Sequence, residues 1–397
     1  MEGHSVLVDL FVLFAAAKVA GELFEHFGQP AVVGELLAGI LVGPFALGLV
    51  GAGEGEVLEV VAELGVIILL FTVGLETSID DLRAVGRPAL IVGFLGVVLP
   101  FAAGAGLMFG LGYDSTDALF VSAAIVATSV GVTARVLRDL GAVQTKFARV
   151  VLGAAVVDDI LAILVLAFVA GSAEGGISTV GIVVLLLEVA AFLALVLVFG
   201  PRATRRLSSV VRIPGVPESP FLVAVLLTLG LAALSEVIGL AAIIGAFFAG
   251  LIFEFRREEV VTQIEPVYEF LVPFFFAITG SRLDPNVFTD PTVLGLASVV
   301  TVIAIVAKGA GGYFGALELG RLPALAVGVG MVPRGEVGLI VASLGLGLGL
   351  DAQLFGVVIA MTVVTTLVTP PLLTPLVRRI VPDAEERPPE EGHFRSI

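Results

Sequence analysis

The chain has 397 residues, of which 58% are hydrophobic and 14% charged, with a mean hydropathy of +1.12 and a formal net charge of −15. Soluble domains carry about 25% charged residues, so this composition argues against a soluble domain and favours a protein that lies in a lipid bilayer. The negative charge argues against a nucleic-acid partner, and the absence of cysteine excludes disulfides and cysteine-ligated metals.

Apolar runs long enough to cross a bilayer follow one another along the whole chain. A spanning helix needs about 20 mostly apolar residues, and the strand-like alternation of a membrane β-barrel is not seen in these runs. We therefore predict an all-α polytopic membrane protein with about 13 transmembrane helices. In chain order the predicted spans are 5–26, 30–50, 57–76, 88–112, 116–136, 148–171, 178–200, 219–236, 238–255, 267–282, 291–318, 323–350 and 352–377.

Basic residues are divided unequally between the loops on the two sides of the membrane. One set of loops carries nearly all of the arginines, from Arg83 through Arg135 and Arg138 to the arginines of the tail, whereas the other set carries only Arg282. By the positive-inside rule the basic side is cytoplasmic. With an odd number of spans, we predict a plasma-membrane protein whose N-terminus lies outside and whose C-terminus lies in the cytoplasm.

Two predicted spans contain residues that interrupt a helix near its middle. Span 116–136 contains Thr128 and Ser129 beside a glycine, and span 323–350 contains Pro333, Arg334, Gly335 and Glu336. Proline and glycine weaken a helix, and non-helical backbone at membrane depth is tolerated where it lines a cavity or is covered by protein.

The positions of the two interruptions suggest an internal repeat. If the seventh span is a linker, each interrupted span is the fifth of a half of six, and the halves enter the membrane from opposite sides. Such inverted repeats are typical of secondary transporters, whose substrate site lies where the two broken helices cross. The predicted parts are an N-terminal repeat at 1–177, a linker helix and cytoplasmic loop at 178–212, a C-terminal repeat at 213–380, and a disordered cytoplasmic tail at 381–397.

Adjacent carboxylates, Asp158 and Asp159, lie inside the apolar span 148–171. An ionisable residue within a span costs several kcal/mol, which makes the pair a functional candidate. Neighbouring helical residues point about 100° apart, so one carboxylate can line a cavity while the other meets a partner helix. Lys308, midway along span 291–318, is the predicted partner, because a buried lysine needs an acid.

This arrangement suits the exchange of cations for protons. A cavity carboxylate is a hard oxygen ligand for Na⁺ and also a proton site, and partial desolvation makes the two compete. Only the carboxylate that holds a proton or a cation crosses a low-dielectric barrier at low cost, and this requirement couples the proton flux to the cation flux. Thr128 and Ser129 are predicted either to supply further oxygen ligands or to pack helices together. Arg334 and Glu336 are predicted either to neutralise half-helix dipoles or to form an interfacial ion pair.

Several stretches in this order resemble the monovalent cation:proton antiporter 2 family of the cation/proton antiporter superfamily, and the resemblance covers nearly the whole chain. They are Gln29–Pro44, Phe71–Glu76, Thr128 and Ser129, Asp158 and Asp159, Lys308, and Pro333–Gly338. The resemblance implies a homodimer in which a core domain moves like an elevator against a dimerisation domain. It further implies that Asp159 takes the Na⁺ (or Li⁺) and the proton, that Asp158 pairs with Lys308 in part of the cycle, and that exchange is electrogenic.

Other functions remain open from the residues alone. The runner-up is a K⁺/H⁺ antiporter of the same family, followed by a passive cation channel and an intramembrane aspartyl protease. Neither an enzymatic activity nor a cofactor is expected. Glu35 and Glu76 either line a cavity or lie near an interface.

Overall fold

The structure is a computed structural model in which the following residues are described: 5–51, 55–77, 80, 84–173, 179–200, 219–253, 257–285, 289, 291–335, 338, 341, 345 and 350–381. These residues form helices and their connections, with no strand among them. The predicted all-α fold is therefore confirmed for the part of the chain that the structure describes.

The helices follow the predicted spans closely. They are α1 (Val6–His26), α2 (Ala31–Val42), α3 (Gly55–Leu75), α5 (Gly86–Gly110), α6 (Ser115–Val126), α7 (Val130–Asp139), α8 (Lys146–Ala173), α9 (Thr179–Ala194) continued by a π-helical turn (Leu195–Phe199), α11 (Ser219–Val237), α12 (Ala242–Ile252), α13 (Arg257–Ser281), α14 (Pro291–Gly315), a 3-10 turn (Leu317–Leu319), α15 (Arg321–Gly330) and α17 (Ala352–Ile380). Span 116–136 corresponds to α6 and α7 together, as the interruption at Thr128 and Ser129 predicts.

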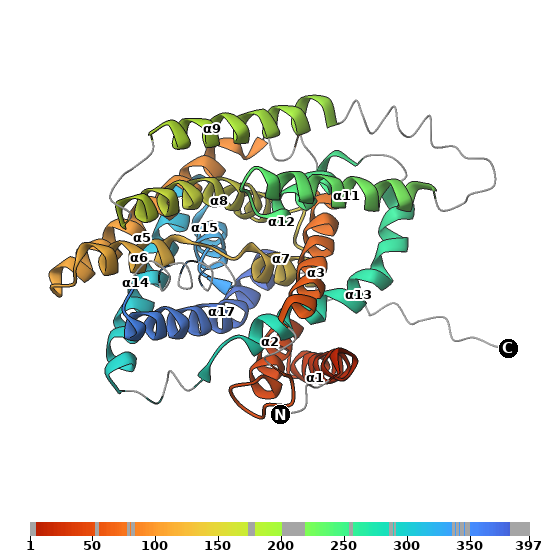
Figure 1. The fold of residues 1–397 in the computed structure, drawn as a ribbon. Coiled ribbons are helices and arrows are strands. Elements are labelled where there is room, and N and C mark those ends of the chain that lie inside the picture. The colour runs from red at the N-terminus through yellow and green to blue at the C-terminus, as the bar shows by residue number, and fades with distance from the viewer. Residues whose placement is uncertain are drawn as a thin grey trace.

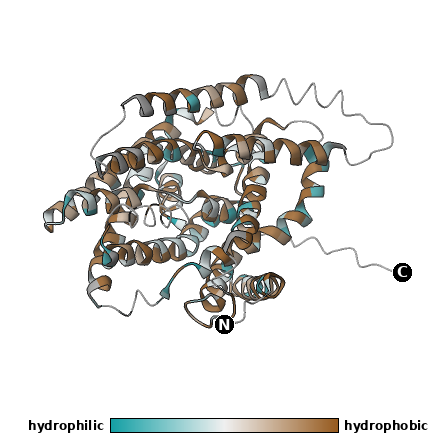
Figure 2. Ribbon diagram, in the orientation of Figure 1, coloured by the Kyte–Doolittle hydropathy of each residue, from teal (hydrophilic) through white to brown (hydrophobic). Residues whose placement is uncertain are grey.

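Apolar residues dominate the ribbon, as Figure 2 shows. Within the described residues, seven helices are long and apolar enough to cross a membrane by length and composition alone. Three further apolar helices are shorter, namely α2, α12 and α15. The chain is thus a multi-pass membrane protein.

Among the boundaries that differ from the predicted ones, those of α13 and α2 have a clear physical reason. Helix α13 begins at Arg257, ten residues before the predicted span 267–282, because a helix continues into water through charged residues that an apolar-run criterion rejects. Helix α2 ends at Val42, well before residue 50, because Gly43 takes an extended conformation ahead of Pro44.

The helices pack into two groups. One group contains α1, α2, α3, α11, α12 and α13, in which α3 packs along both α12 and α13, and α2 packs against α1 and α13. The other group contains α5, α6, α8, α14, α15 and α17, in which α5 packs along α6, α8 and α14. Figure 1 shows α5, α6, α14 and α17 on one side of the molecule and α1, α2, α3 and α13 on the other, and α7 lies between the two groups.

Glycines bring backbones into direct contact within the first group. A Cβ atom on Gly74 of α3 would lie 2.1 Å from the carbonyl oxygen of Phe247 on α12, and one on Gly250 would lie 2.1 Å from that of Phe71. Likewise, a Cβ on Gly39 of α2 would lie 2.0 Å from the carbonyl oxygen of Ala277 on α13. Small residues at helix crossings permit this close approach, which makes the first group a tightly packed block.

Substitution of Gly74 by alanine should therefore destabilise the fold. The added methyl group would overlap the α12 backbone, and overpacking of this kind costs about 1–3 kcal/mol. The thermal unfolding midpoint of Gly74→Ala in detergent should fall below that of the wild type. The matched control is Gly106→Ala in α5, where a Cβ meets nothing within 4 Å and the midpoint should not fall.

Candidate functional site

The two interrupted helices meet at their breaks. Residues 127–129 separate α6 from α7 without helical structure, and α15 ends at Gly330 ahead of a non-helical stretch through Arg334. The Ser129 amide donates a 2.8 Å hydrogen bond to the Pro333 carbonyl oxygen. The backbone of one break therefore supplies a hydrogen-bond partner for the backbone of the other. The Thr133 hydroxyl donates a second bond, of 2.6 Å, to the Gly330 carbonyl oxygen. The crossing that the sequence suggested is thus present among the described residues.

Glycine is required where the two breaks touch. Gly335 has φ +41°, and a Cβ atom there would lie 2.5 Å from the Ser129 hydroxyl oxygen. A side chain at residue 335 would be strained by the positive φ and would also push the two breaks apart. The Gly335 amide instead donates to the Thr366 hydroxyl of α17 at 3.1 Å.

Arg334 is fully buried beside this crossing. Its guanidinium donates to the carbonyl oxygens of Val332 at 2.6 Å and of Met331 at 3.3 Å, just beyond the end of α15, and to that of Ala304 on α14 at 3.2 Å. The last carbonyls of a helix carry partial negative charge, so a cation here offsets it. The dipole-neutralising role of Arg334 stays a prediction, and Glu336 lies outside the described residues.

Asp158 and Lys308 form a buried ion pair. The Lys308 Nζ atom lies 2.5 Å from Asp158 Oδ1, and both side chains are fully inaccessible. Lys308 also donates to the Val126 carbonyl oxygen at 2.7 Å, which ties the pair to the end of α6. A buried pair of this kind is stable only if each charge keeps its partner, because desolvation of both ions must be offset.

Helix α5 leaves room for this pair at Gly96. A Cβ atom on Gly96 would meet the Lys308 Cε atom at 3.5 Å and Asp158 Oδ1 at 3.6 Å, so a larger side chain would displace both. The pair is therefore enclosed by α5, α6, α8 and α14, four helices of the second group. Asp158 Oδ2 is buried and accepts no hydrogen bond from the described part of the chain.

Asp159 faces a different environment from Asp158. It is half-buried and lines a small cavity of about 20 Å³ together with residues of α3, α7, α8 and α12. The other lining residues are Leu70, Val130, Leu152, Ala155, Val156, Ile243, Ile244 and Phe247. The cavity lies on the seam between the two helix groups, and it holds little more than one water-sized body. An otherwise apolar cavity with one carboxylate suits a dehydrated cation or a proton better than a larger solute.

The remaining predicted oxygen ligands lie in the crossing. Thr128 and Ser129 are both buried, and Ser129 directly precedes Val130 of the Asp159 cavity. The Thr128 hydroxyl oxygen lies 3.5 Å from the Val126 carbonyl oxygen. The structure thus brings Asp158, Lys308 and the α6 break together by direct contact, and it places Asp159 across the helix in a cavity beside α7.

Two arginines that the sequence assigned to a loop prove to be helical. Arg135 and Arg138 lie in the last turns of α7, where Arg135 is buried and contacts Glu35, and Arg138 contacts Glu76 and Glu265. The apolar run ends at residue 136, but the charge count assigned both arginines to the cytoplasmic loop that follows it. Their spacing of three residues, which places them on one helical face, was the signal that could have revealed a shared partner surface.

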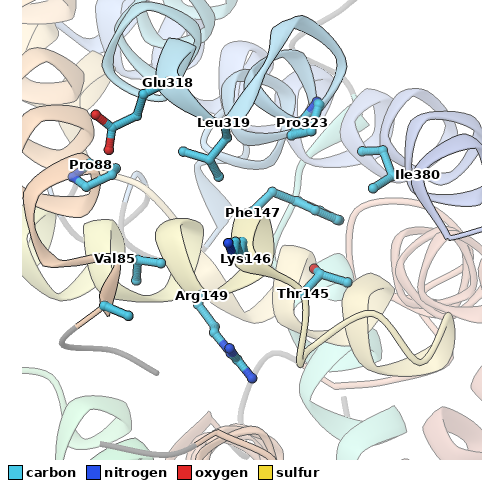
Figure 3. Close-up of a pocket in the computed structure, with 11 residues that line it drawn as sticks. Val85, Pro88, Thr145, Lys146, Phe147, Arg149, Glu318, Leu319, Pro323 and Ile380 are labelled. Carbon is cyan, nitrogen blue, oxygen red and sulfur yellow. The ribbon is translucent and has the colours of Figure 1, made fainter. Parts of the chain in front are cut away.

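A larger cavity, of about 500 Å³, is separate from the aspartate pair (Figure 3). It is lined by the start of α8, including Lys146 and Arg149, by the start of α5, and by Glu318 and Pro323 around the start of α15. It contains none of the predicted site residues, and its basic side chains belong to the end of the molecule that the charge distribution assigns to the cytoplasm.

Comparison with known proteins finds relatives whose names describe Na⁺/H⁺ exchange. The family described as "Sodium/hydrogen exchanger, transmembrane" matches residues 10–379 of this chain. Among curated proteins, the chain is 37% identical over 413 residues to the high-affinity Na⁺/H⁺ antiporter NhaS3 of Synechocystis sp., with 93% of this chain and 89% of that protein covered. It is 35% identical over 367 residues to the Na⁺/H⁺-K⁺ antiporter GerN of Bacillus cereus, with 90% and 92% covered.

A solved structure shows a similar fold. The sodium proton antiporter MjNhaP1 of Methanocaldococcus jannaschii, determined at pH 8, aligns with a TM-score of 0.68 over 93% of this chain and 96% of that chain. The sequence identity is 15%, so the likeness concerns the fold alone.

Removal of one partner of the buried ion pair should be strongly destabilising. Lys308→Ala leaves Asp158 as an uncompensated charge in a fully buried site, which costs about 3–5 kcal/mol. The double variant Asp158→Ala/Lys308→Ala removes both charges and should recover part of that loss. Thermal unfolding in detergent measures both effects.

The control for this cycle is an exposed ion pair. Arg282 and Glu59 lie 3.2 Å apart, with 42% and 62% of their side chains exposed, and such pairs contribute about 0–1 kcal/mol. Arg282→Ala should therefore shift the midpoint little. An equally small shift for Lys308→Ala would contradict the assignment of Asp158 and Lys308 as a buried charged pair.

Proposed function

The chain belongs to the sodium/hydrogen exchanger family, and from that premise we propose that it exchanges cytoplasmic Na⁺ (or Li⁺) for external H⁺ by alternating access. The protein is a transporter and not an enzyme, which removes the intramembrane protease from the alternatives. The observation that carries the proposal is the half-buried Asp159 in a small, otherwise apolar cavity on the seam between the two helix groups.

We propose that Asp159 binds the cation and the proton in turn. A carboxylate in an apolar cavity is costly when bare, and either a proton or a monovalent cation relieves that cost. Because both occupy the same oxygens, binding of one expels the other. The hydroxyl and carbonyl oxygens of Thr128 and Ser129, at the break that adjoins the cavity, would complete the cation's ligands.

The Asp158–Lys308 pair would link the charge of the site to this exchange. The two aspartates are adjacent on one helix, and Asp158 Oδ1 already has Lys308 as a partner at 2.5 Å. If Lys308 moves or changes its protonation when Asp159 is occupied, the cycle carries net charge. Arg334, with the carbonyls at the end of α15, would hold the crossing together electrostatically while this happens.

We further propose that the second helix group is the moving core of an elevator. Its helices carry Asp158, Asp159 and Lys308, Arg334 follows the end of α15, and these helices pack mainly with one another. The first group, built on glycine contacts between α2, α3, α12 and α13, would form the static dimerisation domain. In this proposal the repeats span 1–177 and 213–380, joined by the linker at 178–212, and the protein is a homodimer of the plasma membrane with its N-terminus outside.

Net charge movement would matter for the direction of transport. One net charge per cycle is worth about 2.3 kcal/mol per 100 mV. That energy supports roughly a fifty-fold cation gradient, since each 1.4 kcal/mol corresponds to about a tenfold ratio. An electrogenic exchanger therefore expels Na⁺ even when the pH difference across the membrane vanishes.

A K⁺/H⁺ antiporter is the second candidate. The name of the relative GerN includes K⁺ besides Na⁺ and H⁺, so both cations occur among proteins similar to this chain. A passive channel is less favoured, because the cavity of about 20 Å³ at Asp159 has a single carboxylate among apolar residues, whereas a pore needs polar groups along its length.

Replacement of Asp159 by asparagine should abolish exchange. Asparagine keeps the size of the side chain but has neither the negative charge nor the proton site. In proteoliposomes with an imposed proton gradient and a pH-sensitive dye, Na⁺ and Li⁺ should discharge the gradient through the wild type and not through Asp159→Asn. The control is Asp351→Asn at the N-cap of α17, where asparagine also caps the helix and exchange should persist.

The possible outcomes of this assay distinguish the candidates. Full exchange by Asp159→Asn would remove the assigned site. Discharge by K⁺ alone would favour the K⁺/H⁺ antiporter, and discharge of the proton gradient with no added cation, as through a leak, would contradict obligatory exchange.

The rate of exchange should depend on membrane potential. If the Asp158–Lys308 pair couples charge to transport, an imposed inside-negative potential should change the initial rate of Na⁺-driven proton movement in the wild type. The double variant Asp158→Asn/Lys308→Gln, which keeps the shapes without the charges, should lose this dependence. Wild-type rates that are the same at all imposed potentials would show that exchange is electroneutral.

A further inference from the structure

A cluster of charged and aromatic side chains joins α7 to the first helix group at the end of the molecule that is predicted to be cytoplasmic. The Arg135 guanidinium lies 3.7 Å from a Glu35 oxygen on α2. Arg138 lies 3.4 Å from a Glu76 oxygen just beyond α3 and 2.5 Å from a Glu265 oxygen on α13. The Arg138 guanidinium also stacks on the Tyr268 ring of α13, with its carbon 3.7 Å from the ring centre. We name Glu35, Glu76, Arg135, Arg138, Glu265 and Tyr268 the seam cluster.

The seam cluster connects the two helix groups, which the elevator proposal requires to move relative to one another. Helix α7 is the second half of the broken span, and α6, the first half, packs in the second group. Helices α2, α3 and α13 belong to the first group. Each group is held internally by tight packing: glycines join α2, α3, α12 and α13 in the first group, and Gly311 and Gly315 bring α14 against α5 in the second. Across the seam, by contrast, the seam cluster holds α7 through side-chain ion pairs, which separate without repacking a core.

The seam cluster and the Asp159 cavity lie on the same seam. Val130 of α7 and Leu70 of α3 line the cavity, whereas Arg135, Arg138 and Glu76 lie five to eight residues further toward the basic end of the same helices. At 1.5 Å per residue this places the seam cluster about 10 Å from the cavity along the helix axes. Gly131, next to Val130, packs against the Phe275 ring of α13 and Val66 of α3, at the level of the cavity. The seam cluster thus lies between the cavity and the basic end of the molecule.

The ion pairs are graded in exposure, which allows them to open. The Arg135 and Glu35 side chains are 11% and 2% exposed, whereas Glu76 and Glu265 are 27% and 40% exposed. The more exposed pairs border a cavity of about 990 Å³ that is lined by Glu76, Arg138, Glu265 and neighbouring polar residues. Water in this cavity can solvate the separated charges, and the cavity offers space for their movement.

We propose that Arg135 and Arg138 act as positioning residues in a latch that keeps the Asp159 cavity closed toward the cytoplasm in this state, and that this latch must open in each transport cycle. The proposal rests on the alternating-access exchange proposed above. It assigns a function to two arginines that contact neither the cation nor the aspartate pair. Loss of the latch should favour the state that is open to the cytoplasm.

Cysteine accessibility tests the latch directly, because the natural chain contains no cysteine. In the variant Ile244→Cys, the thiol lies on α12 in the wall of the Asp159 cavity. A membrane-impermeant maleimide is added to inside-out vesicles, in which the cytoplasmic face is outermost. Labelling should be slow with the latch intact and about tenfold faster with Arg135→Gln/Arg138→Gln, a shift that corresponds to about 1.4 kcal/mol between the two states.

Two further variants separate a latch from a general loss of stability. Exchange of the charges in Arg138→Glu/Glu265→Arg, combined with Glu76→Gln so that residue 138 meets no like charge, should return labelling toward the slow rate, since the pair with residue 265 re-forms with opposite polarity. Glu59→Gln/Arg282→Gln removes an ion pair at α3 and the end of α13, within one helix group, and should leave labelling slow. If Arg135→Gln/Arg138→Gln does not fold, Glu76→Gln/Glu265→Gln removes the two acidic partners of Arg138 and should also accelerate labelling.

Labelling that is unchanged in the latch variants would overturn the proposal, as would equal acceleration by Glu59→Gln/Arg282→Gln. The measurement needs no transported ion, so it is independent of the exchange assay. A wild type that labels as expected but exchanges no cation would count against the proposed function alone. A wild type that exchanges Na⁺, with labelling unaffected by the arginines, would count against the latch alone.

Discussion

The buried contact between Asp158 and Lys308 is the constraint on which the rest of this structure depends. Neither charge is stable alone in a fully inaccessible site, so α8 and α14 must stay together. The second bond of Lys308, to the Val126 carbonyl, fixes the end of α6 at the same point. One amine therefore sets the relative positions of three helices, and the crossing of the broken helices is built around it. Asp159, the residue after Asp158, faces the seam between the two helix groups.

The contacts within a helix group differ from the contacts across the seam. Within the first group, glycines such as Gly39 and Gly250 bring backbone against backbone, and such contacts allow little sliding. At the seam, α7 meets the same group through arginine side chains, an aromatic ring and one small residue, Gly131. A protein that must move one part against another in a bilayer, where apolar association is weak, benefits from this division between rigid contacts and separable ones.

Much of the fold follows from the sequence because the bilayer imposes a strict length and polarity on each helix. Span 116–136 and its interruption at Thr128 were predictable, and so was the divergence of Asp158 and Asp159, because helix geometry alone turns neighbouring side chains apart. The seam cluster was not predictable. The charge count assigned Arg135 to a cytoplasmic loop, whereas in the structure it is buried beside Glu35, about 100 residues away in the sequence. The early start of α13 at Arg257 was missed because charged turns extend a helix beyond the apolar region.

The placement of both aspartates on one uninterrupted helix has a consequence for how this family of sequences can change. From Lys146 onward α8 is continuous, so insertion or deletion of a single residue before Asp158 would rotate both carboxylates by about 100° relative to the start of the helix. Asp158 would leave its amine, and Asp159 would leave the seam. Many substitutions along this stretch preserve the geometry, but a change in its length does not. The number of residues between the start of α8 and the aspartates is therefore as much a part of the site as the carboxylates themselves.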